Sequence, residues 1–203
     1  MLGVNCRLAW RCPKKVQLKA YESLAGPKHL DVGVGNGFYL DRAQFRHDNM
    51  EITLFDLNQH ALDYTSRRIQ RLKPVAFKGD VYEAEDAAKV LAARGGAKFD
   101  SVAIMFVLHC LPGNMEDKAA VIENLSTLVS PDGVLFGTTV LGRGVKHNLF
   151  GRSTMKIFNS NGVFSNREDD EDGLRAALSA SFEEVKVEVH GTVAMFSGRR
   201  PRR

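Results

Sequence analysis

The sequence from His29 to Gly37 reads HLDVGVGNG, and this stretch decides the fold. Its first residues predict a buried strand, and Gly33, Gly35 and Gly37 follow that strand without a spacer. Glycine allows the backbone conformations of a tight turn and lets a ligand come close to the main chain. A helix that starts behind the turn would add its free N–H groups to a ligand site. We therefore expect a strand, a ligand-binding turn and a helix that ends near Phe45.

The rest of the chain alternates short β-like runs with helical patterns, which is typical of a parallel sheet with crossover helices. Further strands are predicted at residues 52–55, 75–78, 101–105 and 134–140, with helices between them at residues 58–72, 84–93 and 114–128. Two alternating runs at residues 185–189 and 193–197 predict an antiparallel hairpin. The expected fold class is α/β: a doubly wound, seven-stranded, mostly parallel sheet that ends in this hairpin.

Residues 141–165 break the alternation. They contain four glycines, scattered aromatic residues and no clean hydrophobic period, so we expect an irregular lid here. The following Ser165-Asn-Arg-Glu168 has the pattern of a capping box, which predicts that the next helix starts there. The acidic run from Glu168 to Asp172 fits the first turn of that helix better than it fits a metal site.

The composition describes an ordinary globular protein of one domain, with 203 residues of which 44% are hydrophobic and 26% are charged. The longest apolar run, residues 102–108, is too short for a membrane helix, and residues 1–15 show no secretory signal. Cys6, Cys12 and Cys110 are too few and wrongly spaced for a disulfide framework or a four-ligand zinc site. We therefore expect a reduced, cytoplasmic location, no membrane partner and no bound metal.

The net charge of +4 has a local origin. Four arginines among the last five residues supply it, because the remaining chain balances 24 cationic residues against 24 acidic ones. Chain termini of this kind tend to fray. We therefore expect one folded domain over residues 1–198 and a solvated basic tail over residues 199–203. Nucleic acid is disfavoured as a partner, although an RNA-binding arm stays open as an alternative.

The pattern Asp31-x-Gly33-x-Gly35-x-Gly37 resembles motif I of the class I S-adenosylmethionine-dependent methyltransferases. It differs from the dinucleotide-binding pattern G-x-G-x-x-G, because Phe38 stands where that pattern has its third glycine. This difference argues against an enzyme that uses a nicotinamide or flavin cofactor.

Asp56 has the place and the spacing of a ribose-binding carboxylate. It ends the second predicted strand, 21 residues after Gly35. A carboxylate at this point can accept hydrogen bonds from the ribose hydroxyls. Capping of the next helix is the alternative role, although Asn58 is available for it.

Three later segments are similar to the same family. Gly79-Asp80-Val81 follows the third strand, and the resemblance implies that Asp80 and the backbone N–H of Val81 bind the adenine ring. The segment from Met105 to Pro112 resembles the post-strand segment of type 11/12 methyltransferases, and residues 130–135 are similar to the hairpin before the fifth strand. The chain is thus identified as a type 11/12-like member of this family, for which a Rossmann-like fold is expected.

The resemblance implies S-adenosylmethionine as the cofactor. Residues 1–28 would cover this cofactor, with Arg11 paired to its carboxylate or, alternatively, exposed as a surface arginine, and residues 141–165 would form the acceptor lid. The cofactor-binding residues that the resemblance implies are Asp31, Gly33, Gly35, Gly37, Asp56, Leu57, Asp80, Val81, Met105, Phe106 and Arg11.

The implied reaction is methyl transfer to oxygen, nitrogen or carbon of a small organic acceptor, as in secondary metabolism. Residues 105–109 lack the Asn/Asp-Pro-Pro-aromatic stretch that is typical of methylases of DNA amino groups or glutamine amides. Because the lid is short, a homodimer would help to enclose the acceptor. Two alternatives stay open: a cofactor-binding protein without transfer activity, of regulatory or cyclase-like function, and an RNA methyltransferase.

His109 is the candidate catalytic base, because the fourth strand delivers it toward the methyl end of the cofactor and imidazole accepts protons near neutral pH. A structural role for His109 competes with this prediction, and His147 in the lid is the alternative base. The predicted acceptor pocket contains His147, Phe150, Met155 and Phe158, together with Ile157 and Phe164. Plain packing of the lid on the sheet is the alternative for each of these side chains.

Overall fold

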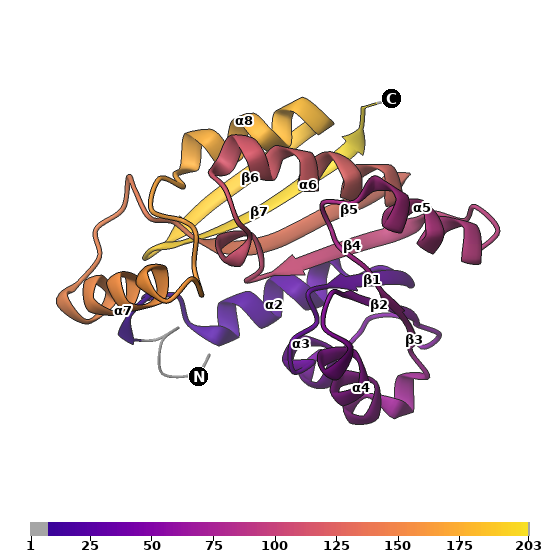
Figure 1. Ribbon diagram of the computed structural model, residues 1–203. Helices are drawn as coiled ribbons and strands as arrows, with labels where there is room; N and C mark the ends of the chain where they lie inside the picture. The colour runs from indigo at the N-terminus through magenta and orange to yellow at the C-terminus, as the bar shows by residue number, and fades with distance from the viewer. Residues whose placement is uncertain (1–7, 203) are drawn as a thin grey trace.

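The computed structural model describes residues 8–202, which form a seven-stranded sheet with helices on both faces (Figure 1). The strand order is β3-β2-β1-β4-β5-β7-β6. β7 runs antiparallel to both of its neighbours, β5 and β6, and the pairs among β1 to β5 are parallel. This arrangement confirms the predicted α/β fold with its antiparallel C-terminal hairpin.

The strands are β1 (Lys28–Val32), β2 (Glu51–Asp56), β3 (Val75–Lys78), β4 (Phe99–Met105), β5 (Val129–Val140), β6 (Phe182–His190) and β7 (Val193–Pro201). The helices are α2 (Lys14–Leu24), α3 (Phe38–Arg42), α4 (Gln59–Arg68), α5 (Ala84–Ala93), α6 (Met115–Leu128), α7 (Leu149–Ser160) and α8 (Glu171–Ser181). Two short 3-10 turns are η1 (Gln70–Leu72) and η2 (Leu108–Cys110). No helix within residues 8–202 is long and apolar enough to cross a bilayer.

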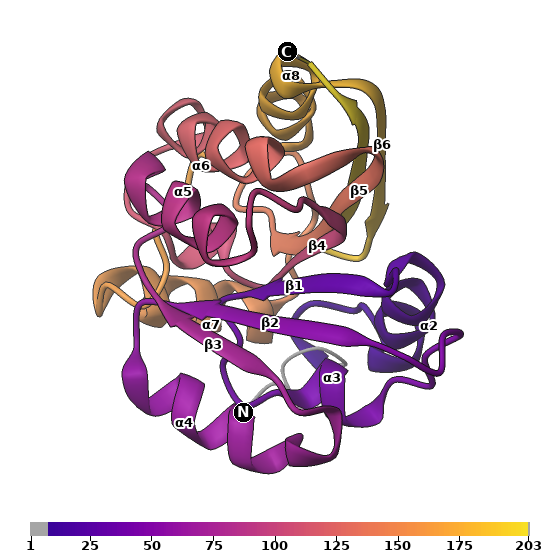
Figure 2. The ribbon, with the colours of Figure 1, turned by 90° about the vertical axis from the view of Figure 1, so that its right-hand side faces the viewer.

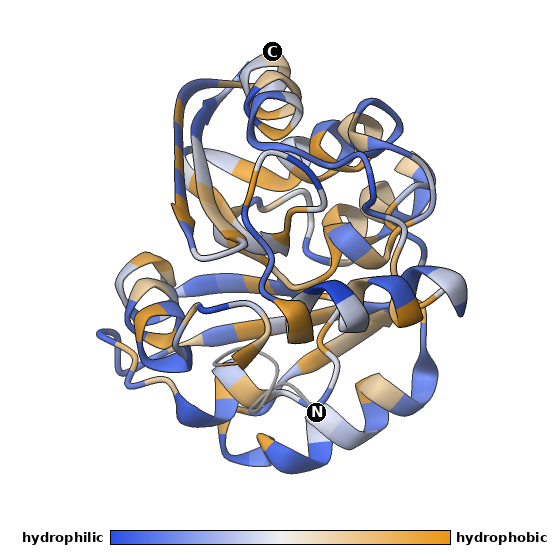
Figure 3. Cartoon of the chain, turned by 90° about the vertical axis from the view of Figure 1, so that its left-hand side faces the viewer, coloured by the Kyte–Doolittle hydropathy of each residue, from blue (hydrophilic) through white to orange (hydrophobic). Residues whose placement is uncertain are grey.

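The helices form two layers around the sheet. α5, α6 and α8 pack on one face, whereas α2, α3 and α4 pack on the other (Figure 2). Hydrophobic and hydrophilic residues alternate along the outer helices (Figure 3), as expected for helices that bury only one face. The interior strand β1 is covered from both sides, so even its polar residues His29 and Asp31 are buried.

The parallel strands bring distant segments to one edge of the sheet. Val32 of β1 lies beside Phe55 of β2 and beside Ile104 of β4. Parallel strands end at the same edge, so the glycine turn after β1, Asp56 at the end of β2 and the chain after β4 emerge together. In doubly wound folds this is the edge at which ligands bind.

The segment 141–165 contains a helix, α7, that the sequence analysis did not predict. The side chain of Asn148 caps it and accepts a hydrogen bond from the backbone N–H of Gly151 at 2.7 Å. The buried face of α7 consists of Gly151, Thr154 and Met155. This mixed set of residues gives no clear apolar period, which is why the prediction of an irregular segment is wrong for this part of the lid.

The next helix starts later than the capping-box pattern predicts. α8 begins after Asp170, whose carboxylate accepts a hydrogen bond from the backbone N–H of Gly173 at 2.9 Å. Asn166 is buried instead, and its amide donates to the carbonyl of Val140 at 2.7 Å. The capping prediction at residues 165–168 is therefore wrong, because a contact with the end of β5 occupies this segment.

The predicted basic tail belongs to the sheet. β7 runs on to Pro201, and Arg199 pairs with Val134 of β5 and with Glu184 of β6. The side chain of Arg200 forms an ion pair with Glu184 at 3.2 Å. The prediction of a frayed tail that starts at residue 199 is therefore wrong for the backbone, because strand pairing extends past the point where the hydrophobic alternation stops.

Candidate active site

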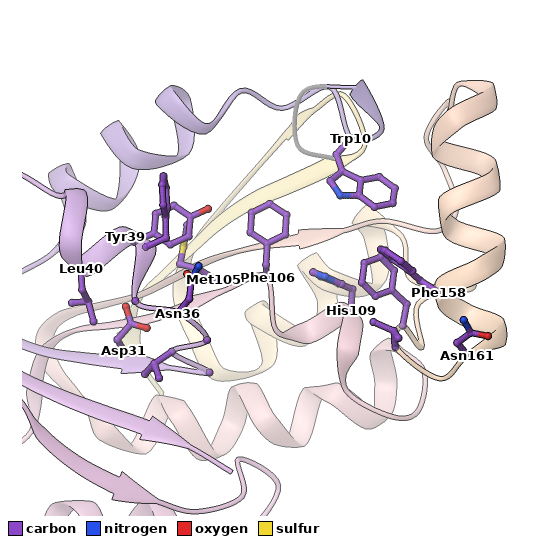
Figure 4. A pocket seen from close by; sticks show the side chains of 17 residues that line it. Trp10, Asp31, Asn36, Tyr39, Leu40, Met105, Phe106, His109, Phe158 and Asn161 are labelled. Carbon is purple, nitrogen blue, oxygen red and sulfur yellow. The ribbon is translucent and has the colours of Figure 1, made fainter. Parts of the chain in front are cut away.

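A cavity of about 410 Å³ lies where β1 and β4 end (Figure 4). Its first end, here called the glycine end, consists of the glycine turn and Asp31. Its second end, here called the aromatic end, is lined by Trp10, Phe106, Phe158 and Phe164. The cavity thus joins a polar main-chain surface to an apolar space.

All three glycines of the turn have positive φ, at +67°, +52° and +67°, but the space around their Cα atoms differs. A Cβ at Gly33 would lie 2.2 Å from Val107, and a Cβ at Gly37 would lie 2.8 Å from Thr65. At Gly35 the nearest atom would be 4.0 Å away. Packing therefore requires Gly33 and Gly37, whereas Gly35 leaves open space through which a ligand can approach the main chain.

A buried chain of polar groups holds the carboxylate of Asp31. The hydroxyl of Tyr21 on α2 donates to this carboxylate and lies 2.8 Å from Nε2 of His29, whose Nδ1 is 2.7 Å from the hydroxyl of Ser101. Burial and the neighbouring Asp31 raise the pKa of Tyr21 well above its usual value, so the phenol keeps its proton. His29 and Asp31 are two residues apart and point to the same face of β1. This spacing is the sequence signal that could have revealed the buried chain of polar groups.

The aromatic end is built around Phe164. The centroid of its ring lies 4.4 Å from that of His109, 5.0 Å from that of Phe158 and 5.9 Å from that of Trp10. Phe106 packs edge-on against His109 at 5.7 Å. Aromatic pairs at these separations and tilts stabilise one another. The rings come from widely separated segments of the chain and together make this end of the cavity apolar.

His109 on η2 is 3% exposed, and Figure 4 shows its ring between Phe106 and Phe158. Its Nδ1 accepts a hydrogen bond from the backbone N–H of Val140 at 3.3 Å. Burial, together with the nearby ammonium of Lys118, lowers the pKa of His109 from 6.5 to about 3. The imidazole is therefore uncharged at neutral pH.

Comparison with known proteins identifies the family. The model of a methyltransferase domain family matches residues 30–135 of the chain. The Physcion biosynthesis cluster O-methyltransferase of Aspergillus chevalieri is 40% identical over 204 residues, which cover 100% of this chain and 88% of that protein. The chain belongs to the class I S-adenosylmethionine-dependent methyltransferases.

Two further similarities extend over almost the whole methyltransferase. The uncharacterized protein YbcY of Escherichia coli (strain K12) is 44% identical over 199 residues, or 97% of each chain. The solved structure of an O-methyltransferase family protein from Burkholderia thailandensis matches with a TM-score of 0.68 at 16% identity. The match covers 92% of this chain but 56% of that one, and at this identity it shows that the fold is shared.

The glycine end and the strand ends beside it fit S-adenosylmethionine, the cofactor of this methyltransferase. The open face of Gly35 exposes main chain to the ligand. Oδ1 of Asp56 accepts the backbone N–H of Asn58 at 2.8 Å, whereas its Oδ2 has no partner among residues 8–202 and is free for a ribose hydroxyl. Asp80 accepts the backbone N–H of Tyr82 at 3.0 Å, which fixes its carboxylate at the end of β3.

The other predicted cofactor residues are divided between the cavity and its surroundings. Met105 and Phe106 line the cavity, and Phe106 has a left-handed backbone with φ of 59°. Leu57, Val81 and Arg11 lie outside the lining, with Leu57 62% exposed and Arg11 exposed. Cofactor contacts of these three residues, and of Asp56 and Asp80, stay predictions.

The structure brings only part of the predicted acceptor pocket to the cavity. Phe158 lines it, but His147, Phe150 and Met155 do not. His147 and Met155 instead line a separate surface groove beside α7, and Nε2 of His147 lies 2.9 Å from the carbonyl of Leu141. Phe150 is about half exposed on the outside of α7. Phe150 and Met155 lie on different faces of α7, and His147 precedes this helix and contacts the main chain of Leu141 instead.

Several cavity residues were not predicted from the sequence, and Tyr39 and Asn161 are the two at its opposite sides. Tyr39 follows the glycine turn, and its hydroxyl donates to Oε1 of Gln17 on α2 at 2.6 Å. Asn161 ends α7 at the opposite side of the cavity (Figure 4). The spacing of neither residue distinguishes it from a surface side chain, so the sequence carried no signal for them.

Proposed function

We propose that this methyltransferase transfers a methyl group to an oxygen atom of a small, largely apolar organic acceptor. The observation that carries the proposal is the cavity in which the glycine end and the aromatic end meet. The first end suits the cofactor and the second suits an apolar acceptor. The O-methyltransferase of Aspergillus chevalieri, from a biosynthesis cluster, supports oxygen as the methylated atom and secondary metabolism as the setting.

The residues of the chain bind, orient and enclose the reactants. When bound, S-adenosylmethionine supplies a methyl group on a positively charged sulfur. The glycine turn, with Asp56 and Asp80 at the neighbouring strand ends, would hold the nucleoside part at the sheet edge. Met105 lines the cavity next to Phe106, where the glycine end meets the aromatic end. The rings around Phe164 exclude water and align the acceptor, so positioning and desolvation supply the rate enhancement.

The proposal also covers the cellular location and the partners of the protein. We propose a reducing cytoplasm, which fits the free thiols of Cys12 and Cys110. A nucleic-acid partner is not part of the proposal, because Arg199 and Arg200 belong to β7 and form no flexible arm. A homodimer that completes the enclosure stays a prediction.

The test incubates the purified chain with methyl-labelled S-adenosylmethionine and a panel of phenols, carboxylic acids, amines and thiols of similar size. We expect labelled ethers or esters, identified by mass spectrometry, and no product with the variant Gly35→Val. Products labelled only on nitrogen, sulfur or carbon would contradict the proposal. Tight cofactor binding without any labelled product would instead support the alternative of a binding protein without transfer activity.

A further inference from the structure

The cavity holds few groups that can exchange a proton. Of the described residues that line it, only Asp31, Tyr39 and His109 carry titratable side chains. Asp31 belongs to the glycine end and accepts the Tyr21 hydroxyl, and the hydroxyl of Tyr39 donates to Gln17. His109 is therefore the one titratable side chain at the aromatic end, within the part of the chain that the structure describes.

The hydrogen bonds of His109 fix the position of its proton. Nδ1 faces the backbone N–H of Val140, which can only donate a hydrogen bond, so Nδ1 must be the unprotonated ring nitrogen. The hydroxyl of Thr139 lies 3.4 Å from the same atom and can donate to it as well. The neutral ring therefore carries its proton on Nε2, which has no hydrogen-bond partner among residues 8–202. His109 thus offers the cavity a donor and no acceptor.

The charges around His109 keep it in this state. Nζ of Lys118 on α6 lies 2.6 Å from Oδ2 of Asp169 and 2.6 Å from the carbonyl of Ser165, and its charge opposes a second charge on the imidazole. Cys110 beside His109 stays a neutral thiol, because partial desolvation of its sulfur raises its pKa to about 11. On β5, the hydroxyl of Thr139 and the backbone N–H of Val140 face the imidazole. On its other side lies the ring of Phe164, which carries no charge.

We propose that His109 donates a hydrogen bond from Nε2 to the acceptor oxygen, and that the methyltransferase selects acceptors whose hydroxyl is acidic enough to enter the cavity already ionised. Acidic phenols and enols are the acceptor class that this describes. The inference rests on the proposed oxygen acceptor. It follows from geometry: a site with a fixed donor and no base binds an oxyanion better than it deprotonates an alcohol.

The chemistry balances without a base on the chain. The hydroxyl proton leaves to bulk water before the acceptor binds. The oxyanion then provides the electron pair of the new O–C bond, and the S–C bond breaks with its electron pair left on sulfur. A negative oxygen and a positive sulfur become a neutral ether and a neutral thioether, so no proton has to move in the transfer step.

The first test uses ring-substituted phenols of equal size, with pKa values that extend several units below the value of about 10 for an ordinary phenol. We measure kcat/KM against pH at saturating S-adenosylmethionine. The acidic limb of each profile should move with the pKa of the phenol, and at pH 7 phenols should react faster as their pKa falls from about 10 toward 7. An acidic limb that stays at one pH for all phenols would show a base on the enzyme and overturn the inference.

The second test compares His109→Gln with His109→Leu. The amide of glutamine can still donate into the cavity, so we expect kcat/KM within about tenfold of the parent, against a loss of about 100-fold for leucine. If His109 were a base, both variants would lose activity equally, which would overturn the inference. Affinity for S-adenosylmethionine, measured on both variants, controls for folding.

Failure of the inference is distinguishable from failure of the proposed function. Methylation of amines or thiols alone would overturn both. Methylation of phenols at rates that do not depend on their acidity would overturn the inference and leave the proposed O-methyl transfer intact. Should either variant fail to fold, the phenol series on the parent protein decides the question by itself.

Discussion

The two ends of the cavity are encoded in opposite ways. The glycine end comes from one continuous stretch, residues 31–37, in which all three glycines have positive φ and Gly33 and Gly37 also pack against Val107 and Thr65. The aromatic end joins Trp10, Phe106, Phe158 and Phe164, which lie up to 154 positions apart in the chain. The comparison suggests that cofactor binding depends on local geometry, whereas the acceptor space depends on long-range packing and on what anchors the lid.

The largest effect is expected at the anchor of the lid. Lys118 and Asp169 form a fully buried ion pair at 2.6 Å, and Lys118 also binds the carbonyl of Ser165. Lys118→Ala leaves a buried carboxylate unpaired, so we expect a loss of about 3–5 kcal/mol in the free energy of unfolding, measured in urea. Lys89→Ala, which removes an exposed pair with Asp86, should change stability far less. Equal losses in both variants would refute the role of Lys118 as an anchor.

At the glycine end a single side chain should abolish cofactor binding. Gly35→Val puts methyl groups into the open space over the main chain, and we expect at least a 100-fold loss of S-adenosylmethionine affinity by calorimetry, or about 2.7 kcal/mol. Gly95→Val is the matched control, because Gly95 also has positive φ and open space but lies outside the cavity. Both variants should lose a similar amount of stability, about 1–2 kcal/mol. Preserved affinity in Gly35→Val would show that the cofactor does not lie on this turn.

The aromatic end should make stability depend on pH through His109. Its pKa is about 3 in the folded chain and about 6.5 when unfolded. Between these values the imidazole is protonated in the unfolded chain and neutral in the folded chain. The free energy of unfolding therefore falls as the pH falls below 6.5. From pH 7.5 to 5 we expect a loss of about 2 kcal/mol that His109→Leu lacks. Identical pH profiles for parent and variant would contradict the buried, neutral imidazole.

The smallest of these effects concerns one hydrogen bond to the cofactor. Asp56→Asn should weaken S-adenosylmethionine binding by about 1.5 kcal/mol, or roughly tenfold, because a charged acceptor for a ribose hydroxyl is lost. Asp63→Asn on α4 is the control, since its carboxylate is exposed and binds Gln59. An unchanged dissociation constant in the Asp56 variant would remove this residue from the cofactor site.

The contrast between the two ends also separates what the sequence predicted from what it did not. The strand alternation and the glycine turn are local patterns, and they placed β1 to β5 and the hairpin correctly. α7 was missed because its buried face, Gly151, Thr154 and Met155, is too mixed to give a hydrophobic period. The capping pattern at residues 165–168 was misleading, because Asn166 is used in a contact with Val140 of β5 instead.

The sequence by itself determined the fold class, the family and the turn on which the cofactor is expected, because strand periodicity and glycine conformation depend on near neighbours in the chain. Only the tertiary structure decided which rings form the aromatic end, and that His109 is neutral and presents a donor. The state of His109 depends on burial, on the N–H of Val140 and on the charge of Lys118. Val140 lies 31 positions from His109, so no local pattern contains this information.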